Sequence, residues 1–492
     1  MIKYLGKNYV NGQWQEHRND FVKSSPATQF EHGAYPLSTV VEVEQAVFAA
    51  RQAQKSWQAI GRVQRAEYFD KLCQLLKARH QEIVDLITIE TGKNLNESHA
   101  EVIEALHMAQ YTFGRARMPS GDVITSELPE RDSYVIRKPK GVVAVISPWN
   151  FPFAIGGFWC AAPALLEGNT VVFKPSELTP GCGQLITELY HEAGFPPGTF
   201  NLVHGAGGTG NFLVHSDVNH ICFTGSVDVG TSIRRACSSS RDKTCSCEMG
   251  SKSAVIIFDD CDLDLAVQAS LNSAFKLSGQ RCVSAGRLLV QRSILDNFKQ
   301  KFLAEVAKVT LDDGSWNTQS PGLRIGPLIS AGQKANVERY ATMIENDSHA
   351  SVLCKYLGPL FNGHYFGPMV YECEWADKPY LKQEIFGPVV GIIPFDTAED
   401  AIRIYNDTNY GLAVGVCTNN YRIMREMRDN CDAGMIYFNL GSIGAESHLP
   451  FSGVKMSGYG HGSAAATFDA VVHEVAVTYN HAQGVTFPQG LK

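Results

Sequence analysis

The amino-acid sequence predicts an α/β protein built around a buried parallel sheet. Short, wholly apolar segments at 142–147, 169–174 and 220–224 alternate with segments that have the periodicity of helices. Strands that are apolar on both faces belong in a parallel sheet that helices cover on both sides. A chain of 492 residues is too long for one simple core, so we expect two or three domains. A nucleotide would bind at the carboxyl ends of the strands in such a sheet.

The first third of the chain is predicted to form a hairpin and three helices. Tyr9–Trp14 contains the Asn-Gly pair that favours a two-residue hairpin turn. Apolar residues at helical spacing begin at Val43, continue over 63–91 up to Gly92, and return over 97–113. We expect these helices to cover the sheet.

Two segments of different character flank the α/β regions. Residues 122–138 are polar and β-prone with no core face of their own, which is typical of a strand that projects to pair with another element or subunit. The β-prone tail at 470–479 is a candidate partner.

In the second half, the α/β pattern returns. Strands are expected there at 254–258, 287–290 and 411–416, and helices at 263–278, 293–309 and 397–407, while a helix at 179–193 belongs to the first α/β region.

Composition indicates an ordinary globular protein of the cytoplasm. The 43 basic and 50 acidic residues nearly balance without a basic block, so neither nucleic acid nor an anionic membrane is expected as a partner. No apolar run approaches transmembrane length, and the first ten residues lack the features of a signal peptide. Cysteines in the cytoplasm stay reduced. Cys245 and Cys247, with Cys237 and Cys261 nearby, lack the Cys-x-x-Cys spacing of a metal site, so no metal is expected.

Cys282 is the candidate nucleophile. It lies in Gly279-Gln-Arg-Cys282, between a helical segment and an apolar strand, where a turn can present sulfur to a cleft. Glu248, 34 residues earlier, lies at a glycine-containing turn before another apolar strand. A thiol with a carboxylate base is a sound pair for covalent chemistry. The alternative is that Cys282, one of 13 cysteines, is a small buried hydrophobe.

Two turns are candidate phosphate sites. Gly205-Ala-Gly-Gly-Thr-Gly210 matches G-x-G-x-x-G, but the acidic residue expected about twenty positions later has no clear counterpart, since Asp228 lies in a turn. Phe223-Thr-Gly-Ser226 follows the next strand and precedes a helix expected near Gly230, whose first backbone amides suit an anion. Both could instead be plain β–α turns.

Two further loops follow strands. Lys174-Pro-Ser-Glu177 offers a donor and an acceptor to ribose hydroxyls, or is only a charged loop. In Pro148-Trp-Asn-Phe-Pro152, Asn150 is the polar side chain that can reach a cleft, where its N–H would stabilise an oxyanion. An ordinary asparagine in a turn is the alternative.

Taken together, these runs carry a family likeness. In order along the chain stand the segments Pro148-Trp-Asn-Phe-Pro, Lys174-Pro-Ser-Glu, Phe223-Thr-Gly-Ser, Glu248-Met-Gly-Ser-Lys, Gly279-Gln-Arg-Cys, Glu384-Ile-Phe-Gly-Pro and Pro450-Phe-Ser-Gly. Their order and spacing resemble the NAD(P)-dependent aldehyde dehydrogenase superfamily over nearly the whole chain. The implied fold class is α/β, with a Rossmann-type cofactor domain, an α/β catalytic domain and a β-arm for oligomerisation.

The resemblance implies a role for each matching residue. It makes Cys282 the nucleophile, Glu248 the general base, and Asn150 part of an oxyanion hole with the backbone N–H of Cys282. The implied cofactor contacts are Trp149, Lys174, Glu177, Gly205, Gly225, Ser226, Glu384 and Phe386. The implied domains are 1–121 with 139–249 for the cofactor, 250–450 for catalysis, and 122–138 with 467–492 for the arm and tail. A homodimer or homotetramer follows from the arm.

The likeness leaves several points open. Met249, Ser251 and Ser452 replace residues usual in the family, and serine fills space that glycine leaves to a close backbone approach. NAD is the expected cofactor and NADP a possible one, because Glu177 would repel a 2′-phosphate. The rival functions are a CoA-acylating aldehyde dehydrogenase, against which Glu248 argues, and a non-catalytic protein on the same scaffold.

The substrate is expected to be a small aldehyde, and the chain favours one with a carboxylate. Residues 441–447 form a small-residue loop like those of relatives that act on amino-acid semialdehydes, such as aminoadipate and glutamate semialdehyde dehydrogenases. Exposed amides of such a loop can bind a carboxylate. The candidate substrate contacts are Arg281, Ser442, Gly444 and Ala445. Against this, the loop could be a simple turn, Arg281 could pair with a structural carboxylate, and Glu446 would repel an anion unless it faces away.

Overall fold

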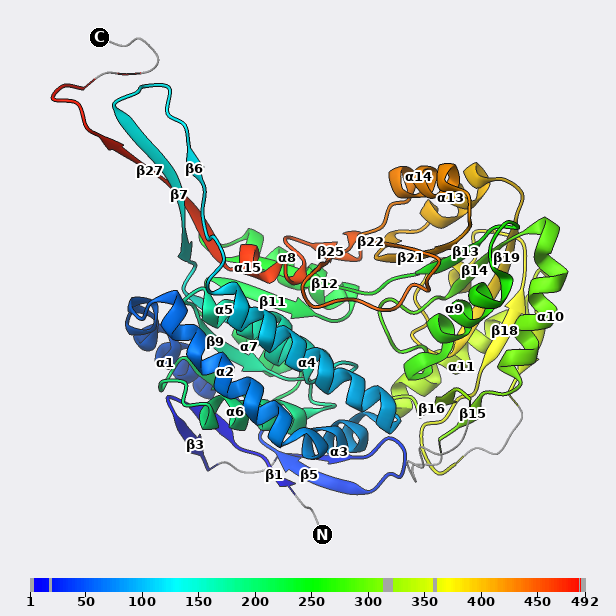
Figure 1. Cartoon of the computed structure of the whole chain (residues 1–492). Helices are drawn as coiled ribbons and strands as arrows, with labels where there is room; N and C mark the ends of the chain where they lie inside the picture. Colours follow the sequence, from blue (N-terminus) through cyan, green and yellow to red (C-terminus); the bar gives the residue numbers. More distant parts are fainter. Residues whose placement is uncertain (1–3, 17–19, 313–321, 357–360, 486, 488–492) are drawn as a thin grey trace.

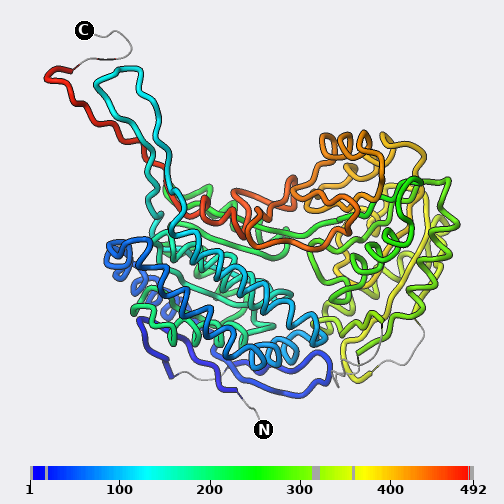
Figure 2. The backbone as a smooth tube through the Cα atoms, viewed as in Figure 1, coloured from blue at the N-terminus to red at the C-terminus, as the bar shows by residue number. Residues whose placement is uncertain are grey.

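The protein consists of two α/β bodies joined side by side, with a β-arm that projects from one of them (Figure 1). The computed structural model describes residues 4–16, 20–312, 322–356, 361–485 and 487. Of the predicted tail at 467–492, residues 486 and 488–492 lie outside the described residues. The first described strand, β1 (Tyr4–Leu5), lies at the lower edge of the first body in blue, and the red C-terminal strand β27 (Val472–Asn480) lies in the arm (Figure 2).

The first body is built on an eight-stranded sheet in the order β25-β12-β11-β8-β9-β10-β2-β3. Its five central strands are parallel, and the edge strands β25, β2 and β3 are antiparallel. The strands are β2 (Asn8–Val10), β3 (Gln13–Gln15), β8 (Val142–Ile146), β9 (Thr170–Lys174), β10 (Phe200–Leu202), β11 (His220–Thr224), β12 (Thr244–Glu248) and β25 (Gly458–Tyr459). The chain runs outward from β8 through β9 and β10, then returns to place β11 on the other side of β8. This reversal creates a crevice at the carboxyl ends of β8 and β11, where doubly wound sheets bind ligands.

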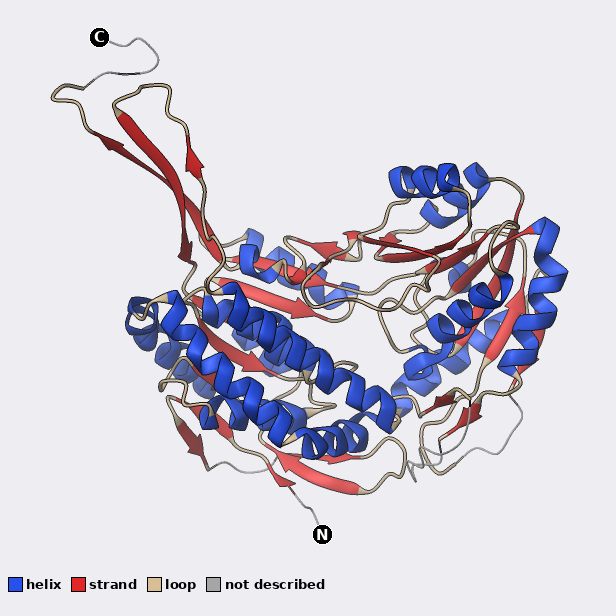
Figure 3. Ribbon diagram, in the orientation of Figure 1, coloured by secondary structure: helices blue, strands red, loops and turns tan. Residues whose placement is uncertain are grey.

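Helices cover both faces of this sheet, as the apolar strands require (Figure 3). Alternate residues of β8 point to opposite faces: Val143 and Val145 join one core with α2 to α6, whereas Val142 and Ala144 join another with α1, α7 and α8. The helices are α1 (Val40–Ala59), α2 (Arg62–Ala78), α3 (His80–Thr91), α4 (Leu95–Arg115), a π-helix (Ile155–Cys160), α5 (Ala161–Leu166), α6 (Pro180–Glu192), α7 (Gly207–His215) and α8 (Val227–Ser238).

Two predicted helices have different bounds in the structure. The single helix expected over 63–91 is two helices, because Arg79 leaves the helical conformation with ψ of 16°. Its guanidinium pairs there with Glu82, Glu188 and Glu192. The helix expected near Gly230 begins at Val227, since Ser226 caps it.

The second body contains a seven-stranded sheet in the order β17-β18-β19-β14-β13-β21-β22, parallel except at β17. Its strands are β13 (Ala254–Ile257), β14 (Arg287–Gln291), β17 (Ser351–Lys355), β18 (Met369–Glu372), β19 (Val389–Phe395), β21 (Ala413–Cys417) and β22 (Met435–Phe438). Its helices are α9 (Leu263–Phe275), α10 (Leu295–Val306), α11 (Ala331–Glu345), α12 (Pro379–Lys382), α13 (Ala398–Asn406) and α14 (Tyr421–Asn430). The helix predicted over 263–278 therefore ends earlier, at Phe275, where a short 3-10 turn (Lys276–Gly279) takes over.

Short strands and one short helix complete the chain. They are β1 (Tyr4–Leu5), β4 (Phe21–Ser24), β5 (Glu31–Tyr35), β15 (Thr310–Leu311), β16 (Arg324–Ile325), β20 (Tyr410–Gly411), β23 (Pro450–Phe451), β24 (Val454–Lys455), β26 (Ser463–Ala464) and α15 (Thr467–Ala470). The predicted hairpin at Tyr9–Trp14 is confirmed: Asn11 and Gly12 take positive φ values of 51° and 81° between β2 and β3.

The arm confirms the predicted pairing of the tail with residues 122–138. It consists of β6 (Val123–Ile124), β7 (Arg131–Pro139) and β27 (Val472–Asn480), all antiparallel. The β27–β7 register runs from Val472 opposite Pro139 to Asn480 opposite Arg131. The three strands extend away from both bodies (Figures 1 and 2).

None of the described helices is both long enough and apolar enough to cross a bilayer.

Candidate active site

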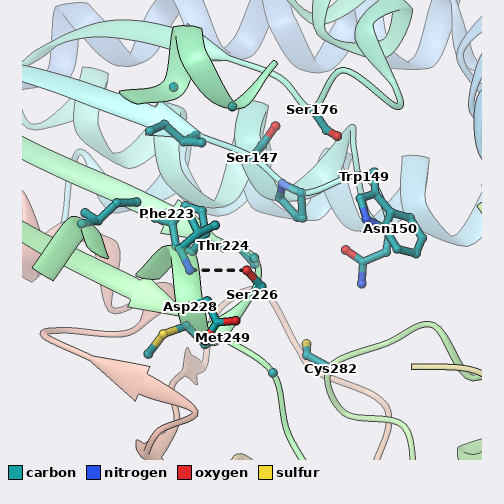
Figure 4. Close-up of a pocket in the computed structure, with 18 of the residues that line it drawn as sticks. Ser147, Trp149, Asn150, Ser176, Phe223, Thr224, Ser226, Asp228, Met249 and Cys282 are labelled. Carbon is teal, nitrogen blue, oxygen red and sulfur yellow. Dashed lines mark hydrogen bonds between the residues drawn. The ribbon is translucent and has the colours of Figure 1, made fainter. Parts of the chain in front are cut away.

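A cavity of about 740 Å³ lies at the carboxyl ends of β8 and β11, at the reversal of strand order. Among the residues that line it are seven of the eight candidate cofactor residues, Trp149, Lys174, Glu177, Gly225, Ser226, Glu384 and Phe386, and the candidate catalytic residues Asn150 and Cys282. We call this cavity the cofactor pocket. It brings together segments from Ile146 to Phe386. Figure 4 shows the part of its lining that lies between Ser147 and Cys282 in the sequence.

The N-terminus of α8 opens into the cofactor pocket. Ser226 caps the helix: its hydroxyl accepts a hydrogen bond from the backbone N–H of Val229 at 3.5 Å, drawn as the dashed line in Figure 4. The first amides of a helix attract an anion through their N–H groups and the helix dipole. Gly225 and Ser226 are therefore placed as the sequence predicts for a pyrophosphate.

Gly205 lies outside the pocket lining, in contrast to the other candidates. It is buried with φ of 152°, and a Cβ there would collide with the side chain of Thr209. Gly205 thus serves the tight turn into α7. Gly207 and Gly210 of the same glycine run line the pocket instead.

Lys174 and Glu177 form the rim of the pocket after β9. Lys174 is buried, donates to the backbone oxygen of Pro175 at 2.8 Å, and lies 3.6 Å from the Glu177 carboxylate. Burial lowers the pKa of Lys174 and the charge of Glu177 opposes that change. The Glu177 side chain is 42% exposed, so its oxygens are open to a ligand.

Glu384 and Phe386 lie on the wall that the second body contributes. The Glu384 carboxylate accepts from the backbone N–H of Ser251 at 2.8 Å. A Cβ at Gly250 would collide with this carboxylate, so a larger residue there would displace the Glu384 side chain. Burial raises the pKa of Glu384 to about 7, against the opposing effects of the Ser251 amide and Lys252. Phe386 takes a positive φ of 56°, and its ring meets that of Trp149 edge-on at 5.4 Å.

Sequence reasoning missed the two side chains that hold this wall. Gln333 on α11 donates to the backbone oxygens of Ile385 and Phe386 at 3.1 and 2.7 Å. Asn336, one helical turn later, donates to Ile385 at 3.2 Å. Both line the cofactor pocket. No motif marks them, because amides on a helix surface are common.

Cys282 is presented by a strained segment, residues 276–282, which we call the catalytic turn. Leu277 and Ser278 have φ of 55° and 54°, a conformation unfavourable for residues with side chains. The Leu277 N–H donates to Glu97 at 2.6 Å, and the Ser278 hydroxyl donates to Gly326 at 2.6 Å. These hydrogen bonds to segments distant in the sequence stabilise the strained conformation.

Gly279 and Gln280 complete the anchoring of the catalytic turn. Gly279 has φ of 68°, and a Cβ there would collide with the backbone of Gly387. The Gln280 side-chain amide accepts from the Ile329 N–H at 3.0 Å and donates to Pro327 at 3.2 Å. Gly279 and Gln280 therefore both have structural roles. Gly279 permits close packing against Gly387, and Gln280 fixes the conformation of the turn.

Asn150 and Cys282 face the same space from opposite walls (Figure 4). The Asn150 amide donates to the backbone oxygen of Gln280 at 3.0 Å, two residues before the cysteine. Its second N–H is left to bind another oxygen. Burial raises the pKa of the Cys282 thiol to about 12, and the charges of Glu384 and Glu248 add to this increase.

Glu248 ends β12 behind the pocket, where it is 3% exposed and does not line the cavity. Its Oε2 is buried without a hydrogen-bond partner among the described residues. Burial raises the pKa of this carboxyl well above its usual range. The charge of Glu248 contributes to the raised pKa of the Cys282 thiol.

The loop 441–447 contacts Ser273 of α9 and Val283, the residue after the catalytic turn, and its Ser442 hydroxyl is not the free donor that was predicted. The Ser442 hydroxyl is buried and donates to Val283 at 2.6 Å, so it is not free for a substrate. Ala445 packs against the core. Gly444, with φ of 120°, faces open space. Glu446 is exposed and lies 3.4 Å from His448.

Arg281 lies outside the lining of the cofactor pocket. Its guanidinium stacks over the ring of Phe151 at 5.2 Å, and the Lys93 ammonium lies 4.1 Å from the same ring. Lys93 is paired with Glu101, whose carboxylate also accepts from the backbone N–H of Phe153. Arg281 has no carboxylate within 4 Å among the described residues.

The unusual serine at 251 is accommodated without disturbing the wall. Its hydroxyl lies 2.8 Å from that of Ser253, and its backbone N–H holds Glu384. In the described part of the chain, no group of three His, Cys, Asp or Glu side chains is placed to hold a metal ion.

Comparison with known proteins decides the family. The family model described as "Aldehyde dehydrogenase family" matches residues 14–477. The chain belongs to the aldehyde dehydrogenase family. It is therefore an oxidoreductase that converts an aldehyde into the carboxylic acid.

Relatives of this aldehyde dehydrogenase include two enzymes named for semialdehydes. It is 36% identical over 460 residues to the α-ketoglutaric semialdehyde dehydrogenase of Bacillus subtilis (strain 168), covering 92% of this chain and 93% of that one. It is 32% identical over 478 residues to the malonate-semialdehyde dehydrogenase of Listeria monocytogenes serotype 4b (strain CLIP80459), covering 96% of each.

Solved structures confirm the predicted fold class. Lactaldehyde dehydrogenase from Escherichia coli superposes with a TM-score of 0.91 at 30% identity, over 97% of this chain and 100% of that one. Betaine aldehyde dehydrogenase from Staphylococcus aureus, solved in complex with NAD+, also superposes with a TM-score of 0.91 at 30% identity, over 97% of this chain and 95% of that one.

Proposed function

We propose that this aldehyde dehydrogenase oxidises its substrate with NAD+ through a covalent intermediate on Cys282. One observation carries this proposal: the Cys282 thiol and the Asn150 amide line the same cavity, next to the end of β12, where Glu248 Oε2 has no partner among the described residues. A nucleophile, an oxyanion donor and a base are the groups that acyl chemistry needs.

The residues of the cofactor pocket fit NAD+. The amides at the start of α8 suit a pyrophosphate, and the open carboxylate of Glu177 beside Lys174 suits ribose hydroxyls. Glu384 and Phe386 would hold the nicotinamide riboside beside Cys282. When bound, NAD+ supplies a positively charged ring that accepts a hydride.

The chemistry of the chain's own residues follows from their positions. The Cys282 thiolate forms a bond to the aldehyde carbon, and the carbonyl electrons move to oxygen, where Asn150 and the Cys282 backbone N–H stabilise them. The resulting thiohemiacetal becomes a thioester by loss of its hydride. Glu248 then takes a proton from water as the water attacks the thioester. The carbon–sulfur bond breaks, and the acid leaves with the thiol restored.

Glu248 also distinguishes the rival functions. A buried carboxyl with a raised pKa and a free oxygen suits the activation of water, whereas transfer to coenzyme A needs no such base. A non-catalytic scaffold has no use for a strained turn that presents a thiol.

We propose a carboxylated aldehyde as the substrate class. The relatives' names support this, since α-ketoglutaric and malonate semialdehydes each carry a carboxyl group. Arg281, adjacent to the nucleophile and without a carboxylate within 4 Å among the described residues, is the candidate charge. The backbone around Gly444 and Ala445 remains a candidate for the wall beside it.

We further propose the domain division and assembly that the sequence predicts. Residues 1–121 with 139–249 would bind the cofactor and 250–450 would carry catalysis. The arm would join subunits into a homodimer or homotetramer of the cytoplasm. Val123 of β6 is 91% exposed, which is costly for an apolar side chain without a partner. Light scattering of the wild type and of a chain with Val123 and Ile124 replaced by serine tests the assembly.

The activity itself is tested by NADH absorbance with a panel of aldehydes and both nicotinamide cofactors. We expect NADH to form with NAD+ and at least one carboxylated aldehyde, without added coenzyme A. Turnover that requires coenzyme A would support the acylating alternative instead.

A further inference from the structure

Lys252 is a buried lysine that the mechanism does not use. It follows Ser251, whose backbone N–H holds the Glu384 carboxylate, and it is only 3% exposed. Its Nζ donates to the backbone oxygen of Tyr380 in α12 at 2.8 Å, and it has no carboxylate within 4 Å among the described residues. A buried ammonium is costly unless other charges and hydrogen bonds compensate it. One hydrogen bond to a carbonyl compensates it only in part.

A small cavity of about 20 Å³ is lined by both Lys252 and Glu384. Glu384, Ile385 and Phe386 line this cavity and the cofactor pocket alike, so the two spaces share one wall. The volume suits one water molecule, and a water can link an ammonium to a carboxylate. Lys252 therefore borders the wall that carries Glu384, without itself lining the cofactor pocket.

Burial and charge couple the two groups. Burial lowers the pKa of Lys252 to about 7, and the charge of Arg287 adds to this decrease. The charge of Glu384 and, to a smaller extent, that of Cys373 oppose it. Burial likewise raises the pKa of Glu384 to about 7, against the Ser251 N–H and the charge of Lys252. The ammonium thus helps to keep the carboxyl ionised, and the carboxylate helps to keep the amine protonated.

The other described groups that interact with this pair keep one protonation state near neutral pH. Burial lowers the pKa of Arg287 only to about 10, and its guanidinium donates to backbone oxygens. Burial raises the pKa values of the Cys282 and Cys373 thiols and of the Tyr410 hydroxyl to about 12. Arg281, which also lines the small cavity, carries a guanidinium that stays charged in proteins. Between roughly pH 6 and 9, the charge of this wall therefore changes through the pair.

An ionised carboxylate accepts hydrogen bonds from hydroxyls more strongly than a neutral carboxyl does, because the bonds are charge-assisted. We infer that Lys252 is a positioning residue that acts through Glu384, keeping its carboxylate ionised to accept the hydroxyls of the nicotinamide riboside. This inference rests on the proposed function, in which Glu384 contacts that riboside. The alternative is that Lys252 only anchors the Tyr380 carbonyl.

The test follows NAD+ affinity from about pH 6 to about pH 9 by quenching of tryptophan fluorescence. In the wild type, affinity should fall as the pH decreases through about 7, since Glu384 gains a proton. Loss of the ammonium raises the pKa of Glu384. Lys252→Met should therefore bind NAD+ about fivefold more weakly than the wild type near pH 7, but within about twofold of it near pH 9. Lys252→Gln, which keeps a donor without the charge, should behave in the same way.

Lys382→Gln is the matched control for the loss of a lysine charge. Lys382 lies in α12, like the acceptor of Lys252, but it is 30% exposed and lies 3.1 Å from Asp407. Its replacement should leave the pH profile of NAD+ affinity unchanged, because solvent and the paired carboxylate screen its charge.

A double-mutant cycle separates the charge of Lys252 from a structural role. With Glu384→Gln already present, Lys252→Met should change NAD+ affinity by less than about twofold at every pH. Thermal melting should show that the variants are folded, and Lys252→Gln carries the same comparison if Lys252→Met is not. A loss of affinity that is equal at every pH, or that persists beside Glu384→Gln, would overturn the inference, as would wild-type affinity of Lys252→Met at pH 7. Wild-type affinity of Glu384→Gln would instead refute the proposed cofactor contact itself.

Discussion

The cofactor pocket and a second pocket of about 430 Å³, whose lining includes Arg281, are built in different ways. The cofactor pocket is formed by the ends of consecutive strands, so its residues stand in short motifs directly after β8, β9, β11 and β12. The second pocket is formed by the flanks of α4, α9 and α10, which contribute isolated side chains from unrelated segments. A sheet with a reversal of strand order dictates where a nucleotide binds, whereas nothing general dictates the lining between helix flanks. The fold therefore determines where the cofactor pocket lies, whereas the individual side chains of this sequence determine the second pocket.

Removing the nucleophile should separate chemistry from cofactor binding most strongly. Cys282→Ala should lower turnover on the order of 10⁴-fold or more, because no other group can form the thioester. NAD+ affinity, measured by fluorescence titration, should stay within about twofold. Appreciable NADH production by this variant would remove Cys282 from its role.

Replacing the base should separate the two chemical stages. In Glu248→Gln, the first NADH should form in a rapid burst, but steady turnover should fall ~10²–10⁴-fold, since hydrolysis lacks its base. Stopped-flow absorbance measures both phases. An unchanged steady rate would contradict the assignment.

Cofactor preference should depend on the rim of the cofactor pocket alone. The wild type should prefer NAD+ over NADP+, because the open Glu177 carboxylate would repel a 2′-phosphate. Glu177→Gln should raise kcat/KM for NADP+ roughly fivefold, the modest size expected of a solvent-exposed charge. Comparable kcat/KM for the two cofactors in the wild type would argue against this role.

The smallest expected effect concerns the influence of the Glu384 charge on the reactivity of the Cys282 thiol. The pKa of Glu384 is about 7, so its carboxyl is charged at pH 8.5, and that charge raises the pKa of the Cys282 thiol. Glu384→Gln should therefore lower the thiol pKa and speed alkylation of cofactor-free protein by iodoacetamide about threefold at pH 8.5. Glu177→Gln is the control, because the Glu177 carboxylate is 42% exposed and solvent screens its charge. Alkylation no faster than in the control would contradict the electrostatic link.

The same difference between the pockets explains what the sequence could predict. The strands and the β-arm pairing follow from periodicity, whereas the eight candidate cofactor residues were implied by the family resemblance, and seven of them line the pocket. Gly205 was misplaced because a glycine pattern does not reveal which of its glycines makes the turn. Gln333, Asn336 and Glu97 were missed, because each acts on backbone far away in the sequence. The Ser442 hydroxyl was expected to be free for a substrate. Its acceptor is the backbone oxygen of Val283, and no sequence pattern predicts such a contact.

The break at Arg79 has a similar origin. Nothing in the sequence around it resembles a helix stop, since no glycine or proline interrupts 63–91. The break depends on carboxylates of another helix, α6, which bind its guanidinium. Tertiary contacts override local helix propensity at this point.

The central claim is that an acyl group passes through Cys282 and leaves by means of Glu248. Its most direct test is mass spectrometry of Glu248→Gln, acid-quenched during the first turnover with NAD+ and succinic semialdehyde. We expect the peptide that contains Cys282 to gain the mass of one succinyl group, in proportion to the NADH of the burst. NADH formation with an unmodified Cys282 peptide would contradict the account.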